Sequence, residues 1–308
     1  MATLLVSQPN FTDHLTPPGH PERTERIRAV EAALAAPAFG ALVRRDAPYG
    51  DVGLAELVHG PRYLDILRRA RPAEGIGRID EDTFISAQSL DAVSTALGAG
   101  LLALEAVVLG EVTNAFCAVR PPGHHAEHDR PMGFCLVNSI AVVAREAQRK
   151  FGAERVAIVD FDVHHGNGTE DIFKDDPSVM YCSSHQMPLY PGTGDPDFTG
   201  VGNIVNAALP PGSSTDAMQV AYEQRILPAL RAFQPNLLLI SAGFDADSRD
   251  PLAGLNWHPA DFSWLTARLV EIAAECCDGR LVSMLEGGYD RNGLAEGAAA
   301  HVAALMRA

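Results

Sequence analysis

The 308-residue sequence lacks an excess of positive charge, because its 24 Lys and Arg residues are outnumbered by 39 Asp and Glu residues. A protein that binds nucleic acid directly is expected to carry a basic stripe, so the net charge of −15 argues against that class. An acidic surface is compatible with a cationic substrate.

Cysteine is also scarce. The five cysteines form no CxxC pair and lie mostly within apolar runs, which predicts reduced, buried thiols and excludes a disulfide framework. The apolar opening of residues 1–6 is too short for the h-region of a signal peptide. From this opening we expect neither export nor a membrane span, and therefore a cytoplasmic protein.

No Ser-, Gly- or Pro-rich linker, charge block or internal repeat divides the chain, so we expect residues 1–308 to form a single α/β domain. Apolar, β-branched runs alternate with segments of helical periodicity, which predicts an open parallel sheet with helices on both faces. The expected strands cover residues 3–6, 115–119, 155–159, 179–183, 203–209, 237–240 and 281–285. The expected helices cover residues 21–36, 54–67, 86–109, 139–150, 168–173, 215–233, 259–276 and 291–307.

The segment from Asp160 to Asn167 places two carboxylates and two imidazoles directly after a buried strand. Desolvating these groups without a partner is very unfavourable, and a divalent cation is the partner that compensates most. Asp162 and His164 lie on the same side if the backbone is still extended there, and their O and N ligands suit Zn²⁺. Asp245, after the strand at 237–240, is the best third ligand, and Asp247 and Asp250 are the alternatives.

Two further polar clusters follow expected strands, and the carboxyl ends of parallel strands meet at one edge of a sheet. His124 and His125 come after residues 115–119, and Tyr289 comes after residues 281–285. One imidazole is suited to act as general base and then as acid, and a second, paired to a carboxylate such as Asp160, to supply a proton or a positive charge. The phenol of Tyr289 is suited to stabilise an oxyanion. This chemistry is zinc-assisted amide hydrolysis.

Four motifs give the sequence a specific resemblance over nearly its whole length. They occur in the order Arg120-Pro121-Pro122-Gly123-His124-His125, Asp160-Phe161-Asp162-Val163-His164-His165-Gly166-Asn167-Gly168, Ser241-Ala242-Gly243-Phe244-Asp245 and Glu286-Gly287-Gly288-Tyr289. In these motifs the chain resembles the zinc-dependent histone deacetylases and their bacterial amidohydrolase relatives. The resemblance implies the arginase–deacetylase fold.

The resemblance also implies a role for each site residue. The implied zinc ligands are Asp162, His164 and Asp245. His125 would be the general base and acid, His124 bonded to Asp160 the electrostatic partner, and Tyr289 the group that polarises the acyl carbonyl. Asn167 stands where class I enzymes have an aspartate. It matches class II and makes His125 less basic.

The substrate tunnel and structural cations are implied in the same way. Phe134 and Tyr190 match the two aromatic walls of the tunnel for an acetyl-lysine or other acetylated amine, and Gly133 leaves room for its aliphatic stem. A structural potassium ion is implied beside the zinc, held by Asp160, Asp162, His164, Ser183 and Ser184, chiefly through backbone oxygens. A second potassium ion is implied near Phe173, Asp176 and Val179.

Other readings of the substrate remain open. Acetylpolyamine amidohydrolase is the alternative within the family. Its eukaryotic member has a glutamate at the position of Leu252, but Asp82, in the acidic turn of residues 79–84, could pair with a second ammonium. The dinuclear manganese ureohydrolases need another aspartate where this chain has Gly166. A non-catalytic acyl binder would lack Tyr289 or a histidine, and none is missing. The oligomeric state stays open, a homo-oligomer included.

Overall fold

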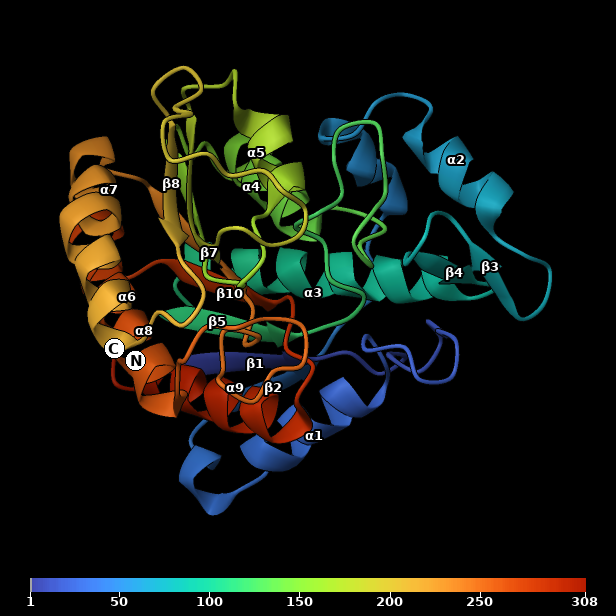
Figure 1. Cartoon of the computed structure of the whole chain (residues 1–308), viewed down its shortest axis with the longest axis horizontal. Helices are drawn as coiled ribbons and strands as arrows, with labels where there is room; N and C mark the ends of the chain where they lie inside the picture. The colour runs from blue at the N-terminus through green and yellow to red at the C-terminus, as the bar shows by residue number, and fades with distance from the viewer. Residues whose placement is uncertain (1) are drawn as a thin grey trace.

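An eight-stranded sheet in the order β2-β1-β5-β10-β9-β6-β7-β8 runs through the computed structural model, which describes residues 2–308 (Figure 1). Every neighbouring pair is parallel. Met1, the start of the apolar opening run, lies outside the described residues. The strands of this sheet are β1 Thr3–Ser7, β2 Val43–Asp46, β5 Asn114–Ala118, β6 Val156–Asp160, β7 Val179–Gln186, β8 Ile204–Leu209, β9 Leu237–Ala242 and β10 Leu281–Leu285.

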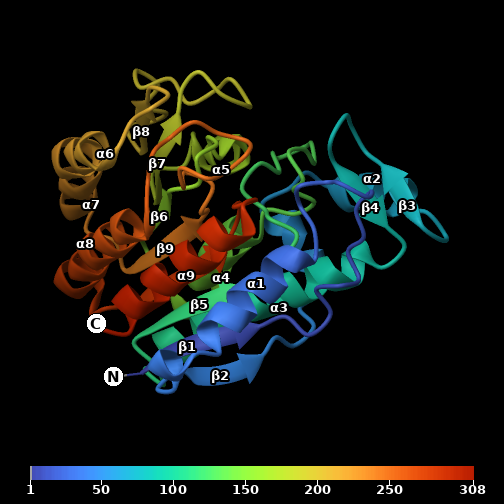
Figure 2. The same cartoon turned by 60° about the horizontal axis from the view of Figure 1, so that its bottom comes forward.

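Helices cover both faces of the sheet, as the sequence predicts. On one face lie α1 and the chain from α6 to α9, and Figure 2 shows α1 and α9 side by side. On the other face lie α2, α3, α4 and α5. The bounds are α1 Glu25–Leu34, α2 Tyr63–Ala70, α3 Ser89–Val108, α4 Ser139–Phe151, α5 Asn167–Phe173, α6 Thr215–Ala221, α7 Leu227–Phe233, α8 Pro259–Cys277 and α9 Arg291–Leu305.

The two layers of helices explain why the central strands read as continuous apolar runs. In β6 the side chains of Val156 and Ile158 enter the core under α3 and α4, whereas Ala157 and Val159 enter the core under α8 and α9. Alternating side chains therefore all meet apolar partners, as expected for a strand buried on both faces. The apolar helix α3 is long enough to cross a membrane, but most of it is buried inside the protein.

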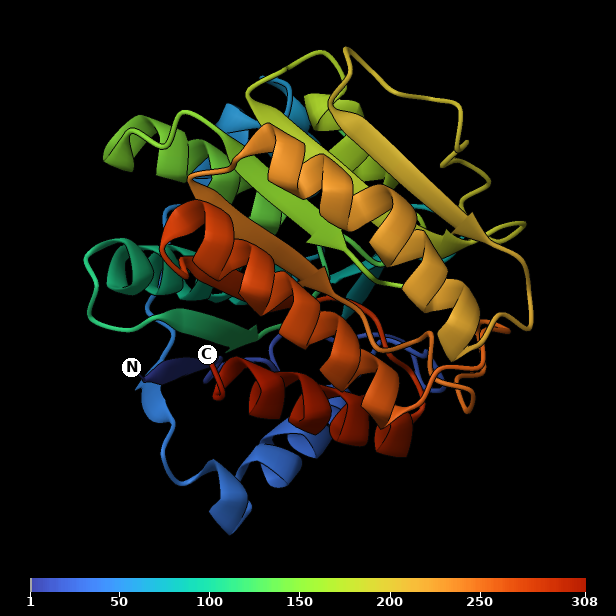
Figure 3. The same ribbon diagram turned by 90° about the vertical axis from the view of Figure 1, so that its left-hand side faces the viewer.

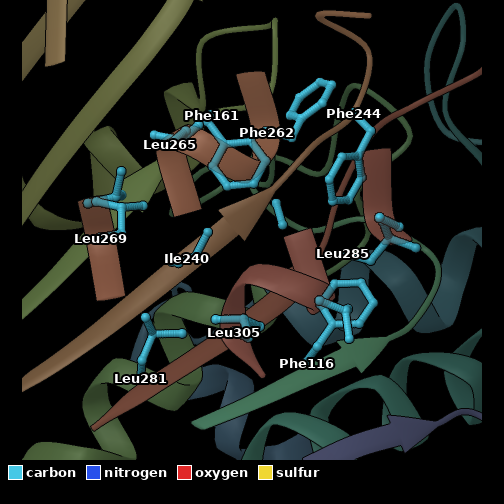
Figure 4. Packing of buried hydrophobic residues seen from close by; sticks show 14 of the residues in the cluster. Phe116, Phe161, Ile240, Phe244, Phe262, Leu265, Leu269, Leu281, Leu285 and Leu305 are labelled. Atoms are coloured by element: carbon cyan, nitrogen blue, oxygen red, sulfur yellow. The ribbon is translucent and has the colours of Figure 1, made fainter. Parts of the chain in front are cut away.

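Aromatic packing in the core fixes the loops that carry the polar clusters. Phe161 and Phe244 are fully buried, and their ring centroids lie 5.7 Å apart beside Phe262 of α8 (Figure 4). Phe161 directly precedes the predicted zinc ligand Asp162, and Phe244 directly precedes Asp245. Full burial of such a side chain stabilises the folded state by about 1.5–3 kcal/mol, so Phe161 and Phe244 hold their two loops against the core.

Several local predictions need correction. The helix predicted over residues 54–67 is a 3₁₀ helix, Val52–Leu57, followed by α2, because Gly60 and Pro61 interrupt it. The strand β2 and the hairpin formed by β3 Ile76–Arg78 and β4 Phe84–Ser86 were not predicted, and the acidic turn joins the two hairpin strands.

Other elements agree with the sequence more closely. The expected helix over residues 215–233 is present as α6 and α7, joined by a π-helical turn, Tyr222–Ile226. Asn138 caps α4 by accepting from the Ala141 amide at 3.1 Å. All five cysteines are free, and four are buried.

Candidate active site

The predicted site residues converge because four strands that are far apart in sequence are neighbours in the sheet. β5, β10, β9 and β6 lie side by side at its centre, and their carboxyl ends point the same way (Figure 3). Asp160 at the end of β6 is in register with Ser241 of β9, and Ala242 is in register with Leu285 of β10. The polar loops therefore begin at one level and face one another.

Asp162, His164 and Asp245 form a compact, buried cluster whose ligand atoms all lie within 4.8 Å of one another. The Nδ1 atom of His164 is 3.1 Å from Asp162 Oδ1 and 3.2 Å from Asp245 Oδ2. The contact to Asp245 Oδ2 lacks hydrogen-bond geometry, so within residues 2–308 this buried oxygen has no hydrogen-bond partner. A buried carboxylate oxygen without a donor is expected to have a cation as its partner, so the three residues fit a metal ion.

The electrostatics of this cluster agree with that fit. Burial, followed by the negative charge of Asp162, raises the pKa of Asp245 to about 7. Two carboxylates this close in a buried site repel each other, and a divalent cation between them would relieve the repulsion.

The two alternative ligands are engaged elsewhere. Asp247 forms an ion pair with Arg249, whose Nε is 2.8 Å from Asp247 Oδ1. Asp250 Oδ2 accepts the backbone N–H of Tyr289 at 2.7 Å, which positions the tyrosine. The structure thus selects Asp245 among the three aspartates that the sequence left open.

His124 is held in a strongly negative environment. Its Nδ1 donates to Asp160 Oδ2 at 2.9 Å, and the hydroxyl of Tyr181 donates to the same oxygen at 3.0 Å. Burial alone would lower the pKa of His124, but the charges of Asp160 and Asp162 outweigh it and raise the pKa to about 10. The carboxylates around His124 therefore favour its protonated, positively charged form.

His125 has the opposite character although it is the next residue. Its Nδ1 donates to Asn167 Oδ1 at 2.8 Å, and the amide of Asn167 is oriented by donating from Nδ2 to Glu127 Oε1 at 2.7 Å. Burial, and then the charge of His124, lower the pKa of His125 well below its ordinary value of 6.5. A neutral ring with its proton on Nδ1 leaves Nε2 free to accept a proton.

Two residues that the sequence analysis did not assign support this arrangement. The buried carboxylate of Glu286 accepts the backbone N–H groups of Gly123 at 2.6 Å and His124 at 3.2 Å, which fixes the loop that carries the histidines. Arg26 of α1 donates from Nε to Gly288 O at 2.7 Å, and its guanidinium lies 5.0 Å from the ring centroid of Tyr289. The sequence could have indicated Glu286, because it is a charged residue just after a buried strand, as the predicted ligands Asp162 and Asp245 are.

A pocket of about 210 Å³ leads to this cluster. All five predicted substrate-binding residues line it, together with His125, His164, Leu189 and Tyr289; the five are Asp82, Gly133, Phe134, Tyr190 and Leu252. Gly133 has a φ of 58°, and a Cβ atom there would lie 2.5 Å from Cδ2 of His125, so only glycine fits beside that ring. Tyr190 lies 5.2 Å from His125 between ring centroids and stays 39% exposed, which places it at the mouth.

The predicted potassium ligands lie at the adjoining ends of β6 and β7, where Asp160 is in register with Ser183. Ser183 Oγ is 2.9 Å from His185 Nδ1, and Ser184 Oγ is 2.8 Å from the hydroxyl of Tyr222. Both serine hydroxyls therefore contact protein groups within the fold.

The eight-stranded parallel sheet, with helices on both faces and polar loops gathered beyond its four central strands, is the arginase–deacetylase fold. The family model of the histone deacetylase domain matches residues 20–305. The chain therefore belongs to the histone deacetylase family.

Individual proteins agree with this assignment. Histone deacetylase 10, chloroplastic, from Oryza sativa subsp. japonica is 40% identical over 301 residues, covering 91% of this chain and 68% of the relative. A histone deacetylase-like amidohydrolase from Pseudomonas aeruginosa is 38% identical over 282 residues, covering 88% and 73%. The crystal structure of the HDA15 HD domain superposes with a TM-score of 0.92 at 34% identity, covering 99% of this chain and 88% of that one. The protein is thus a hydrolytic deacetylase.

Proposed function

We propose that this protein is a zinc-dependent amidohydrolase that removes acetyl or short acyl groups from the ε-amine of acyl-lysine. One observation carries the proposal: the buried Asp162, His164 and Asp245 cluster, with an unpartnered carboxylate oxygen, lies at the end of a narrow pocket beside a neutral histidine.

Asp162, His164 and Asp245 would hold the zinc ion, because two carboxylates and one imidazole match its preference for O and N ligands. When bound there, zinc supplies the Lewis acidity that polarises a carbonyl group and lowers the pKa of a water molecule.

His125 would take the proton of the attacking water at Nε2 and then deliver it to the leaving lysine amine. Its Nδ1–H bond to Asn167 supports this role by fixing the tautomer. An amide partner stabilises the imidazolium less than a carboxylate does, so the class II-like Asn167 favours return of the proton to the amine.

His124 and Tyr289 would stabilise the charge that develops on the substrate. The imidazolium of His124 lies behind the cluster, with Nε2 at 3.8 Å from Asp162 Oδ2. Tyr289 lines the pocket, and burial raises its pKa well above the ordinary value of 10, so the phenol keeps the proton that it would donate to the carbonyl oxygen.

The walls of the pocket favour an acyl-lysine stem. Phe134 and Tyr190 provide aromatic sides, and Leu252 adds an apolar contact where a glutamate would attract a second ammonium. The alternative, acetylpolyamine hydrolysis, is supported by Asp82, which lines the same pocket. Burial, and then the charge of Asp80, raise the pKa of Asp82 above its ordinary value, as expected for a carboxylate that lacks a cationic partner.

A comparison of kcat/KM on an acetyl-lysine peptide and on N-acetylputrescine tests the choice. We expect the wild type to prefer the peptide, and Leu252→Glu to shift the ratio at least about tenfold toward the polyamine, because a new carboxylate pairs with the free ammonium. Leu109→Glu is the matched control, since Leu109 is 61% exposed and does not line the pocket. A wild-type preference for N-acetylputrescine would reject the acyl-lysine proposal in favour of the alternative.

A further inference from the structure

Three backbone carbonyl oxygens converge on one side-chain nitrogen beyond the end of helix α5. Asn203 Nδ2 lies 2.7 Å from Phe173 O, 3.0 Å from Asp176 O and 2.8 Å from Val179 O. We call these three oxygens the carbonyl cage. Asn203 stands just before β8 and is only 3% exposed, so the contact is sheltered from water.

The orientation of the Asn203 amide follows from its other end. Its Oδ1 accepts the backbone N–H of Val201 at 3.2 Å, so the nitrogen is the atom that faces the cage. The reverse orientation would place Oδ1 against the three carbonyl oxygens and the Nδ2 hydrogens against the N–H of Val201. Two amide hydrogens therefore serve three acceptors, one of them shared.

The carbonyl cage is made of the residues near which the family resemblance implies a second potassium ion. In this chain the residues do not fit that ion, because the point closest to all three oxygens is already taken by Asn203 Nδ2. A cation there would have to displace a buried amide and leave its hydrogen-bonding groups unpaired. The N–H dipoles neutralise the same oxygens without the desolvation that a bound ion requires.

We infer that the Asn203 amide takes the place of a monovalent cation in this protein, so that the carbonyl cage needs no potassium. The carbonyl cage is connected to the active site through α5. Helix α5 begins at Asn167, whose Oδ1 orients His125, and ends at Phe173, whose carbonyl enters the cage. Asn203 therefore fixes one end of the helix whose other end sets the tautomer of the proposed general base.

The test measures melting temperature in potassium chloride and in tetramethylammonium chloride at equal ionic strength. The variants are Asn203→Ala, which opens the cage, and the nearly isosteric Asn203→Asp, which adds negative charge to it. Asn114→Ala is the matched control, because Asn114 is also buried but donates from Nδ2 to a single carbonyl, that of Leu305, at 3.0 Å.

Without potassium we expect both Asn203 variants to melt at least about 4 °C below the wild type, because all three carbonyls lose the Asn203 amide and two of them keep only a backbone donor, Asp176 N–H for Phe173 O and Val179 N–H for Asp176 O. Potassium should then raise their melting temperatures by about 3 °C for each tenfold increase once the cage begins to fill. In the wild type and in Asn114→Ala, potassium should raise the melting temperature by a smaller amount. That smaller rise would come from the predicted potassium site beside Asp160, which all the variants share. A potassium response of Asn203→Ala and Asn203→Asp no larger than that of Asn114→Ala would overturn the inference.

A second measurement locates the ion directly. Crystals soaked in rubidium chloride should show anomalous scattering at the carbonyl cage in Asn203→Asp and not in the wild type. A rubidium peak among the three carbonyls of the wild-type protein would refute the inference that the Asn203 amide takes the place of the cation. This result does not depend on the activity of the enzyme.

Discussion

Replacing Tyr289 by Phe removes a single oxygen atom from the wall of the pocket and leaves the packing of the ring in place. The ring is held by the guanidinium of Arg26, 5.0 Å from its centroid, and by the edge of Phe134 at 5.7 Å. The backbone amide is held by Asp250. None of these contacts uses the hydroxyl, and throughout residues 2–308 no protein group is hydrogen-bonded to it.

These contacts determine the expected magnitudes. Since the substitution breaks no internal hydrogen bond, the melting temperature should change by less than about 2 °C. A donor to a developing oxyanion is worth about 2.7–4 kcal/mol, so kcat should fall roughly 10²- to 10³-fold. The two effects are separable because one depends on the ring and the other on the hydroxyl.

The assay compares kcat of the wild type and Tyr289→Phe on an acetyl-lysine peptide and on its trifluoroacetyl analogue, with metal content measured on the same samples. The trifluoroacetyl carbonyl is already activated, so the fall in kcat should be smaller on the trifluoroacetyl substrate than on the acetyl substrate. Phe134→Leu is a suitable control, because it changes an aromatic wall without removing a donor.

The competing view is that Tyr289 only shapes the pocket. Under that view Tyr289→Phe would retain nearly normal kcat on the acetyl-lysine peptide, or both substrates would lose the same factor. Either result would refute the assigned role of the hydroxyl.

Two further predictions concern the rest of the site. His125→Ala should lose roughly 10²- to 10⁴-fold in kcat, more than His124→Ala, because the neutral ring transfers protons and the charged ring acts through its field; equal losses would contradict this division. One transition-metal ion should bind per chain, and exhaustive chelation should abolish activity until zinc is restored. Residues 2–308 contain a second group with ligand spacing, His124, Cys135 and Glu286, but its Glu286 carboxylate accepts two backbone N–H groups and its His124 is bonded to Asp160, which leaves Asp162, His164 and Asp245 for the metal. Elemental analysis that finds two tightly bound transition metals, or full activity after chelation, would rule out the single-metal site.

The sequence alone predicted the elements whose pattern is local and strong. The central strands are continuous apolar runs, and the order of strand and polar loop was enough to expect convergence at one edge of a parallel sheet. The hairpin of β3 and β4 escaped prediction because its strands have three residues each, too few to show a period. The break at Gly60 and Pro61 was visible in the sequence but was outweighed by the apolar spacing on either side.

The site residues divide in the same way. The spacing of Asp162 and His164 predicted that they lie together, but the reason differs from the one expected. The strand β6 ends at Asp160, and a bend in which the His164 N–H donates to Asp162 Oδ1 at 2.9 Å brings the two side chains together. The position of β9 beside β6 brings all three aspartates near this cluster. Asp245 is distinguished from the other two by tertiary contacts, because Asp247 pairs with Arg249 and Asp250 accepts the Tyr289 amide.

The protonation states of His124 and His125 are also tertiary properties. Composition and spacing do not distinguish two adjacent histidines, and only the family resemblance implied different roles for them. Their environments differ here because Asp160 contacts one ring and Asn167 contacts the other. Asn203 is the clearest case of this kind. Its sequence neighbourhood is an ordinary turn before a strand, and only the folded chain brings three carbonyls from the far end of α5 and the start of β7 onto its amide. Sequence spacing determines which groups share a face, whereas the distances between loops remote in sequence are determined by the order in which the strands pair.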